Sequence, residues 1–242
     1  MNVFRNMLYM ARRFKTATVL NLAGLAVAFA ACFLCLTQVN YDLGYNKSFT
    51  EHENLFRMTM NLGPGYEDYG TTLPRPLVER LAATSPHITS HAVMQGSTYI
   101  DQFLVGEQEY SLNLIYGIHD FLSVYKPTLI AGNLKDMNQR DRIVLSRSEA
   151  MRMFGTTDVV NKTLKYKWMD DKFYHVCAVI EDYPENNFLH GTCFIGVNIN
   201  EDDYNNWNYD AYIRVDDAAN LPTVQKAMLQ TAIELFKEKF RL

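Results

Sequence analysis

The chain begins with an apolar stretch that differs from everything after it. No charged residue lies between Lys15 and Asp42, and this interval contains the run TVLNLAGLAVAFAACFLCLTQV. A helix of roughly 20 apolar residues is long enough to cross the hydrocarbon core of a bilayer. The pattern therefore predicts a transmembrane helix over residues 17–40.

The rest of the chain alternates between patterns typical of strands and patterns typical of helices. Strand patterns occur at residues 55–62, 88–94, 99–105, 109–115, 142–145, 163–169, 173–180, 193–197 and 209–215. Helical spacing of apolar residues occurs at residues 77–83, after a capping Ser146, and at residues 221–240. Short turns at residues 106–108 and 170–171 predict two hairpins. This order predicts an α+β fold over residues 41–242, preceded by one membrane helix.

Small and amide side chains recur along the apolar run at intervals of three and four residues. They are Asn21, Gly24, Ala28, Ala31, Cys35 and Gln38. That spacing places all six on one face of a helix. Small residues let two helix backbones approach closely, and amides form hydrogen bonds across such contacts. We expect this face to pack against partner membrane helices; the alternative is a chance pattern, because Gly is frequent in membrane helices in general.

Charge is distributed unevenly about the apolar run. Arg5, Arg12, Arg13 and Lys15 precede it without any acidic residue, and cationic flanks are retained in the cytoplasm. This predicts a cytoplasmic N-terminus and an exported main domain. The net charge is −4 overall and −8 from residue 17 onward, so the domain has no electrostatic basis for binding nucleic acid.

Residues 1–16 also carry apolar side chains at helical spacing. These are Val3, Phe4, Met7, Leu8, Ala11 and Phe14. A basic amphipathic helix of this kind lies in the headgroup layer of a membrane. The sequence leaves open whether this segment is such an interfacial helix or a plain cationic flank.

A cleaved signal sequence is the alternative interpretation of the apolar run. Residues 28–30 resemble a small-x-small cleavage site, and residues 29–32 resemble a lipoprotein box. However, the apolar core of a signal sequence spans about 7–15 residues, and this run continues past Cys32. We therefore interpret it as an uncleaved anchor.

Cysteine and histidine spacing gives no catalytic or metal-binding pattern. Cys32 and Cys35 form a C-x-x-C inside the apolar run, where packing is the expected role. Cys177 and Cys193 lie in predicted strands, and the sequence leaves open a disulfide or two buried thiols. His87 and His91 stand four residues apart, but no third ligand matches them.

Acidic residues in predicted turns are expected to solvate loops. They are Asp101, Glu107, Glu109, Asp170, Asp171, Glu201, Asp202 and Asp203. Residues 200–203 lack the alternating oxygen ligands of a calcium loop. No nucleophile–base pair or phosphate-binding loop is present, so we expect neither an enzyme nor a cofactor nor a metal.

Aromatic residues crowd the segment after the apolar run. Tyr41 and Tyr45, nearest the run, are expected at the membrane interface. The later ones are expected in the core of the domain; they are Phe49, Phe56, Tyr66 and Tyr69.

Short motifs follow one another in an order that resembles a known family. The first are residues 21–25 (NLAGL), Tyr41-Asp42 and residues 55–57 (LFR). Later pieces are Asp120-Phe121, Gly132-Asn133, residues 143–146 (IVLS), Ala150, Phe154-Gly155, residues 160–163 (VNKT), Val176, residues 178–182 (AVIED), Pro184, Asn186 and residues 209–214. Together they resemble MacB/FtsX-type ABC transporter permeases, in the form common among Bacteroidetes.

Two features depart from that family's pattern. Asn161 stands where the family usually has Gly, but Asn also tolerates a left-handed backbone, so we expect the turn to form. Family permeases return to the membrane with three more helices, whereas this sequence stops at Leu242. It is either the N-terminal part of a longer permease or a short relative.

The resemblance implies a function without chemistry in the chain itself. Such permeases couple ATP hydrolysis by a cytoplasmic subunit to export or to activation of a periplasmic partner. It implies a bacterial inner-membrane location, an ABC ATPase partner, and a homodimer or second permease half. The alternative is a single-pass anchored binding or sensing module without an ATPase. A tethered hydrolase is a third hypothesis, and the chain lacks the nucleophile–base pattern it needs.

Overall fold

A computed structural model describes residues 3–61, 70–95, 98–118, 121–196 and 204–240 of the chain. The chain divides into two compact units, Met1–Tyr45 and Asn46–Leu242. Each unit is described by itself.

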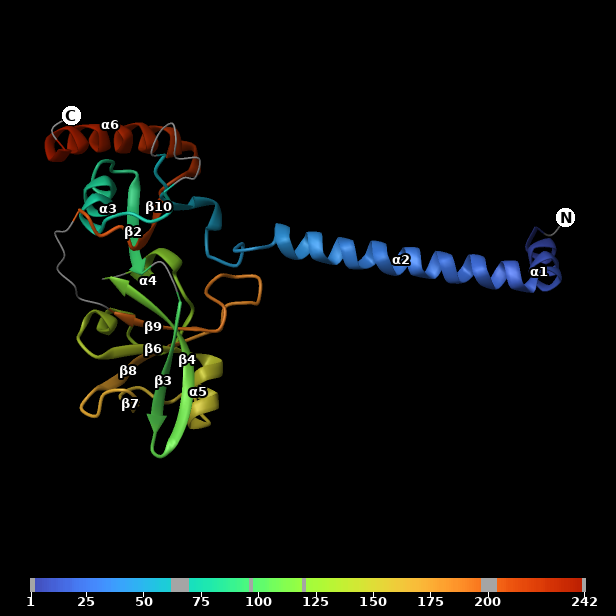
Figure 1. Cartoon of the computed structure of the whole chain (residues 1–242), viewed down its shortest axis with the longest axis horizontal. Helices are drawn as coiled ribbons and strands as arrows, with labels where there is room; N and C mark the ends of the chain where they lie inside the picture. The colour runs from blue at the N-terminus through green and yellow to red at the C-terminus, as the bar shows by residue number, and fades with distance from the viewer. Residues whose placement is uncertain (1–2, 62–69, 96–97, 119–120, 197–203, 241–242) are drawn as a thin grey trace. The chain divides into compact units, whose positions relative to one another are not determined.

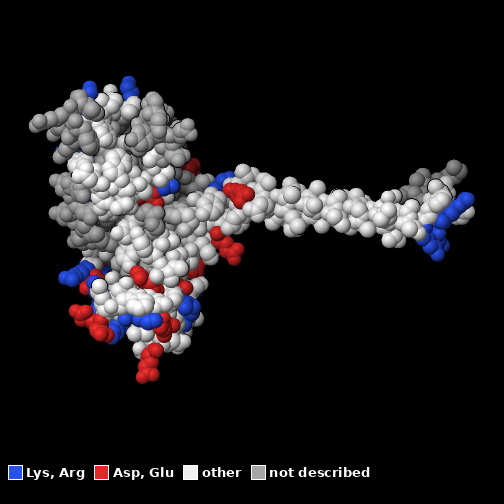
Figure 2. All heavy atoms as spheres, viewed as in Figure 1, with Lys and Arg blue, Asp and Glu red and all other residues white. Residues whose placement is uncertain are grey.

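The first unit consists of two helices. Helix α1 spans Val3–Arg13, and α2 spans Lys15–Leu43, with a break in helical geometry at Phe14. Helix α2 contains the predicted span of 17–40 and continues to Leu43. Helix α2 is the one helix in the described residues that is long and apolar enough to cross a membrane. Figure 2 shows its surface as uncharged between cations at α1 and charged residues at its other end.

The second unit is built from ten strands and four α-helices in its described residues. The strands are β1 Leu55–Arg57, β2 Ile88–Gln95, β3 Tyr99–Val105, β4 Gln108–Ile118, β5 Leu129–Gly132, β6 Arg142–Ser146, β7 Thr163–Tyr166, β8 Phe173–Ile180, β9 Thr192–Gly196 and β10 Tyr209–Val215. The helices are α3 Arg75–Ala82, α4 Phe121–Tyr125, α5 Arg147–Phe154 and α6 Leu221–Phe240, with short 3-10 turns at His52–Asn54, Leu134–Asn138 and Ala218–Asn220.

The strands form one sheet that closes partly on itself. Their order is β1-β10-β2-β4-β3-β7-β8-β6-β9, and a parallel pairing of β4 with β9 joins six of them into a ring. Strand β5 pairs with β8 outside this path. The ring encloses apolar side chains from every strand, including Phe103, Leu114 and Leu145, and α5 adds Ala150. We call this ring with α5 the barrel lobe.

Three further strands form a second lobe with two helices. Strands β1, β10 and β2 lie next to one another, and α3 and α6 pack over them at one end of the domain (Figure 1). Leu77, Val78, Ile213 and Val224 are buried between these layers. We call this part the sheet lobe. Its chain comes from both ends of the domain, whereas the barrel lobe is built from the residues between.

A third apolar cluster joins the two lobes. It contains Phe49, Met94 and Tyr125, together with Val144 and Phe194 on the outer face of the barrel strands. Alternate residues of β6 and β9 therefore point to different cores, as the two-residue period of a strand requires. This cluster lies where the chain enters the domain.

The sequence predicted most of these elements but missed two. Helix α4 has five residues and β5 has four, which is too short for a clear period in the sequence. Two predicted strands are shorter than expected, because β1 ends at Arg57 and β7 ends at Tyr166. The left-handed turn predicted at Asn161 is confirmed by its φ of 66°.

The two cysteines of the domain are free thiols. Cys177 belongs to the cluster that joins the lobes, and Cys193 belongs to the barrel interior. The sheet therefore separates them, and the disulfide that the sequence left open does not form in this fold. Burial raises the pKa of Cys177 to about 11 and that of Cys193 to about 12.

Candidate functional site

The predicted packing face lies on a single continuous helix. Asn21, Gly24, Ala28, Ala31, Cys35 and Gln38 all belong to α2. Every one of them is exposed, and a Cβ added at Gly24 would meet nothing within 4 Å. Gln38 Nε2 donates to Asp42 Oδ1 at 2.9 Å, one turn further along. The helix brings the six residues to one face as expected, and its packing against partner helices stays a prediction.

The segment that follows the membrane helix is fastened to the domain along its whole length. We call residues 46–57 the strap. At its start, Asn46 N donates to Asn186 O at 2.8 Å, and Asn46 Oδ1 accepts from Phe188 N at 3.0 Å. Asn187 Nδ2 donates to Ser48 Oγ at 2.8 Å. These bonds hold the first residues of the strap against the loop that precedes β9.

Phe49 anchors the strap in the cluster that joins the lobes. Its side chain is only 4% exposed. Its ring centroid lies 5.3 Å from that of Tyr125, 5.5 Å from Tyr183 and 5.7 Å from Phe188. These tilted and edge-on arrangements are the favoured geometries of aromatic pairs. Burying a Phe side chain contributes roughly 1.5–3 kcal/mol, so this residue is a major anchor of the strap.

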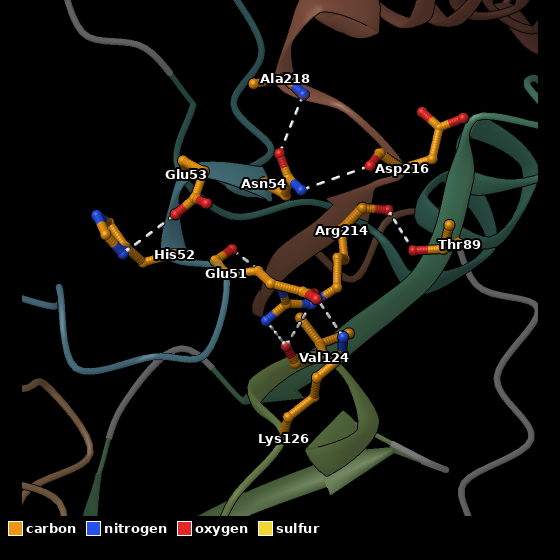
Figure 3. Close-up of polar contacts among 10 residues, drawn as sticks. All are labelled: Glu51, His52, Glu53, Asn54, Thr89, Val124, Lys126, Arg214, Asp216 and Ala218. Atoms are coloured by element: carbon orange, nitrogen blue, oxygen red, sulfur yellow. Dashed lines mark hydrogen bonds and ion pairs between the residues drawn. The ribbon is translucent and has the colours of Figure 1, made fainter.

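Arg214 on β10 lies at the centre of the contacts drawn in Figure 3. Its side chain is 3% exposed. Its Nε and Nη2 donate to Val124 O at 3.0 and 2.7 Å, and Nη1 donates to Glu51 O at 3.0 Å. Glu51 Oε2 lies 3.4 Å from Nη1 and also accepts from Lys126 Nζ at 2.6 Å. One guanidinium therefore binds the strap, α4 and β10 together.

Electrostatics at this cluster follow from burial and pairing. Burial lowers the pKa of the Arg214 guanidinium, and the Glu51 carboxylate partly opposes that shift. The hydrogen bond and charge of Lys126 lower the pKa of Glu51. Arg214 therefore stays charged and bound at neutral pH. Sequence reasoning gave this residue no role, although it is the one cation in the apolar run of β10.

The end of the strap is bound to the sheet lobe. Asn54 Oδ1 accepts from Ala218 N at 3.0 Å, and Asn54 Nδ2 donates to Asp216 O at 3.5 Å (Figure 3). Strand β1 then pairs with β10, placing Leu55 opposite Arg214. Arg57 and Asp210 add an ion pair. The strap thus follows the membrane helix in sequence and contacts the sheet lobe, α4 and the loop between β8 and β9.

The two spaced histidines do not form a shared site. His87 Nδ1 lies 2.9 Å from Asp216 Oδ2, whereas His91 Nε2 lies 2.9 Å from Glu79 Oε2. In the described ranges, no group of three or more His, Cys, Asp or Glu side chains is arranged to hold a metal ion. Residues 200–203 lie outside these ranges.

The loop-solvating role expected for Asp101 is wrong. This residue lies on β3, within the strand predicted at 99–105, where it accepts from Tyr116 Oη at 2.8 Å and from Tyr166 Oη at 3.2 Å. A single carboxylate in a strand pattern gives no sign of such distant partners.

The aromatic residues expected in the core are confirmed where they are described, and the interfacial position of Tyr41 and Tyr45 stays a prediction. Tyr41 and Tyr45 are 39% and 48% exposed, whereas Phe49 is buried and Phe56 packs on the core of the sheet lobe. Tyr66 and Tyr69 lie outside the described residues.

Comparison with known proteins agrees with this architecture. The model of the family described as MacB-like periplasmic core domain matches residues 18–231. A domain assigned to a permease protein from Porphyromonas gingivalis superposes with a TM-score of 0.61 at 20% identity, over 77% of this chain and 83% of that chain. A search of curated proteins finds no match.

Two other solved structures share the fold. The periplasmic region of MacB from Actinobacillus actinomycetemcomitans gives a TM-score of 0.53 at 17% identity, over 76% of this chain and 83% of that chain. The extracellular domain of the noncanonical ABC-type transporter YknZ from Gram-positive bacteria gives a TM-score of 0.51 at 12% identity, over 71% of this chain and 88% of that chain.

The family match covers most of the chain, and it confirms the resemblance read from the sequence motifs. The solved structures confirm the mixed α and β fold of the second unit, which α2 precedes in sequence as one N-terminal apolar helix. The chain belongs to the MacB-like periplasmic core domain family of ABC-type permeases.

Proposed function

We propose that this chain is the N-terminal part of a permease subunit in a MacB/FtsX-type ABC transporter. A partner ATPase in the cytoplasm hydrolyses ATP, and α2 passes the resulting motion to the periplasmic domain. The domain then expels a substrate or activates a periplasmic partner. In this arrangement the N-terminus is cytoplasmic, α2 crosses the bacterial inner membrane, and the chain itself catalyses no reaction.

The strap is the observation that supports this proposal most directly. A flexible linker would isolate the domain from movement of the membrane helix. Here only Gly44 and Tyr45 separate α2 from Asn46, which is already hydrogen-bonded to the domain. Arg214 then connects the strap to β10 and α4. In this proposal, displacement of the helix reaches the sheet lobe, α4 and the loop before β9 through the strap.

The exposed face of α2 supplies the second requirement of a permease. The helix needs partners in the membrane through which an ATPase acts, and its small and amide side chains suit close helix packing. A homodimer or a second permease half would provide those partners. In this proposal the six residues transmit motion within the membrane, while the strap transmits it to the domain.

A groove in the sheet lobe favours a second candidate function. It has a volume of about 680 Å³ and lies between β1 and α6. Met58, Met60, Met228 and Phe236 are among its lining residues. Its volume lies within the roughly 300–1,000 Å³ of small-molecule sites, which suits an anchored binding or sensing module without an ATPase.

Co-purification distinguishes these functions. The full-length protein is expressed at native level with a tag, together with the ABC ATPase encoded beside its gene, and is isolated in mild detergent. A permease subunit yields a stable complex whose ATPase activity changes when the chain is present. Repeated isolation of the chain without the ATPase would contradict the proposal and favour the binding module. A tagged unrelated single-pass protein serves as the control for non-specific capture.

A further inference from the structure

Two residues at the strap hold an unfavourable backbone conformation. Glu51 has a φ of 50° and Lys126 has a φ of 47°. This left-handed region suits Gly, Asn and Asp, and other residues adopt it at an energetic cost. The two are bound to each other through Lys126 Nζ and Glu51 Oε2, beside Arg214. Residues with strained backbones cluster at functional sites in proteins.

An unsatisfied hydroxyl lies next to the same segment. Tyr183 Oη is buried and has no hydrogen-bond partner among the described residues. Its ring packs against Phe49, the anchor of the strap. A buried polar atom without a partner is destabilising, and native proteins contain few of them. The docked strap therefore carries a second unfavourable feature.

The two halves of the strap are held in different ways. Residues 55–57 belong to the sheet through their pairing with β10. Residues 46–51 are held by three hydrogen bonds to the loop at 186–188, by the Phe49 ring and by Arg214. Glu51 lies at the boundary between the halves, so the strained residue occupies the position where one half would separate from the other.

We propose that residues 46–51 form a strained latch with a docked and a released state, hinged at Glu51–Asn54. Release relaxes the left-handed backbone of Glu51 and lets water reach Tyr183 Oη. It also exposes the aromatic pocket of Phe49 and frees Arg214 from Glu51. Lys126 N stays bonded to Leu122 O at 2.9 Å, so the backbone of Lys126 belongs to the end of α4. Buried Phe49 and the Arg214 bonds oppose release. This inference rests on the proposed function, because movement of α2 is what would shift the equilibrium.

Backbone strain can be tested apart from charge with matched substitutions. Glu51→Asn and Glu51→Gln are both neutral amides, but only Asn tolerates the left-handed backbone. Lys126→Asn and Lys126→Met form a second pair as a control, because both remove the ion pair and residue 126 lies outside the latch. Amide hydrogen exchange of peptides covering residues 46–51 is measured by mass spectrometry on the full chain in detergent micelles, without any ATPase.

We expect the strap of Glu51→Asn to exchange about fivefold more slowly than that of Glu51→Gln, since the strained residue of the latch is relieved. The two Lys126 variants should exchange equally. Phe49→Ala should exchange faster than the natural sequence in the same peptide. Exchange in the β3–β4 hairpin should be unchanged in all five variants, which shows that the fold persists. Equal exchange of the two Glu51 variants would overturn the latch, as would strap exchange at the rate of the whole domain.

Failure of the proposed function would look different. If the two Glu51 variants differ in strap exchange as expected, but adding the ATPase and ATP leaves strap exchange unchanged, the latch stands and its coupling to ATP hydrolysis is wrong. If strap exchange responds to ATP but the two Glu51 variants exchange equally, the coupling stands and the strained latch is wrong.

Discussion

Single residues fix the barrel lobe through backbone geometry as well as through side chains. Gly132 at the end of β5 has a φ of 84° and pairs with Ala178 on β8. A Cβ at this position would lie 2.1 Å from Cys177 O and 2.8 Å from Ala178 Cα. Both are backbone atoms of a central strand, so neither can move aside easily. The glycine is required by both its conformation and its surroundings.

We predict that Gly132→Ala is far more destabilising than the same change at Gly155. Gly155 also has a positive φ of 70°, but a Cβ there meets nothing within 4 Å. The left-handed conformation alone lowers the free energy of unfolding by roughly 1–2 kcal/mol when Ala replaces Gly. The clash with backbone atoms raises this loss to about 3 kcal/mol or more for Gly132→Ala. Urea unfolding followed by tryptophan fluorescence measures both values. Equal losses would show that β8 yields to the added methyl group.

Asp216 gives a prediction about acid stability. Hydrogen bonds from His87 and then Asn220 lower its pKa from 3.8 to about 2. A carboxyl group with a lower pKa in the folded state stabilises that state fully above its unfolded pKa. This contribution is lost as pH falls from about 3.8 to about 2.

Asp216→Asn should therefore lower the melting temperature at neutral pH and reduce the acid-induced loss over that interval. Thermal melts across the pH range measure both effects, and exposed Asp158→Asn is the control. If Asp216→Asn keeps the acid slope of the natural sequence, other carboxyl groups are responsible for it.

How well a helix or strand could be predicted from the sequence depended on its length and on the period of its apolar residues. The membrane helix, the β3–β4 hairpin and α6 are long enough for their patterns to be read directly. The strap could not be derived this way, because Phe49, Val124 and Arg214 are far apart in sequence and meet only after folding. Local sequence likewise gives no sign that Glu51 and Lys126 share one ion pair. Motif order identified the family, whereas tertiary contacts set the candidate site.

Helix α2 provides the prediction at this scale. Gly24→Leu places a bulky side chain on the small-residue face and should weaken association with partner helices severalfold in a membrane two-hybrid assay. Ala26→Leu is the matched control, because residue 26 lies on the opposite side of the helix. Equal effects of the two changes, or none from Gly24→Leu, would contradict a specific packing face.

At the scale of the whole molecule, the sequence predicts one change of compartment along the chain. Cations precede α2 and a domain of net negative charge follows it, so we predict that α1 stays in the cytoplasm and residues 46–242 are periplasmic. The four native thiols suit a labelling test of this arrangement. Cys177 and Cys193 are buried with raised pKa values, which keeps them unreactive in the folded chain. Cys32 and Cys35 lie within the predicted span.

Single cysteines introduced at exposed positions report the orientation. Glu107→Cys in the β3–β4 turn should react with a membrane-impermeant maleimide in cells whose outer membrane is permeabilised, whereas Asn6→Cys in α1 should react only after lysis. Substituting Arg5, Arg12, Arg13 and Lys15 with Gln should reduce this difference, since those cations set the direction of insertion. Labelling of Asn6→Cys in intact cells together with protection of Glu107→Cys would reverse the topology. It would also place the strap in the cytoplasm and so contradict the proposed periplasmic function.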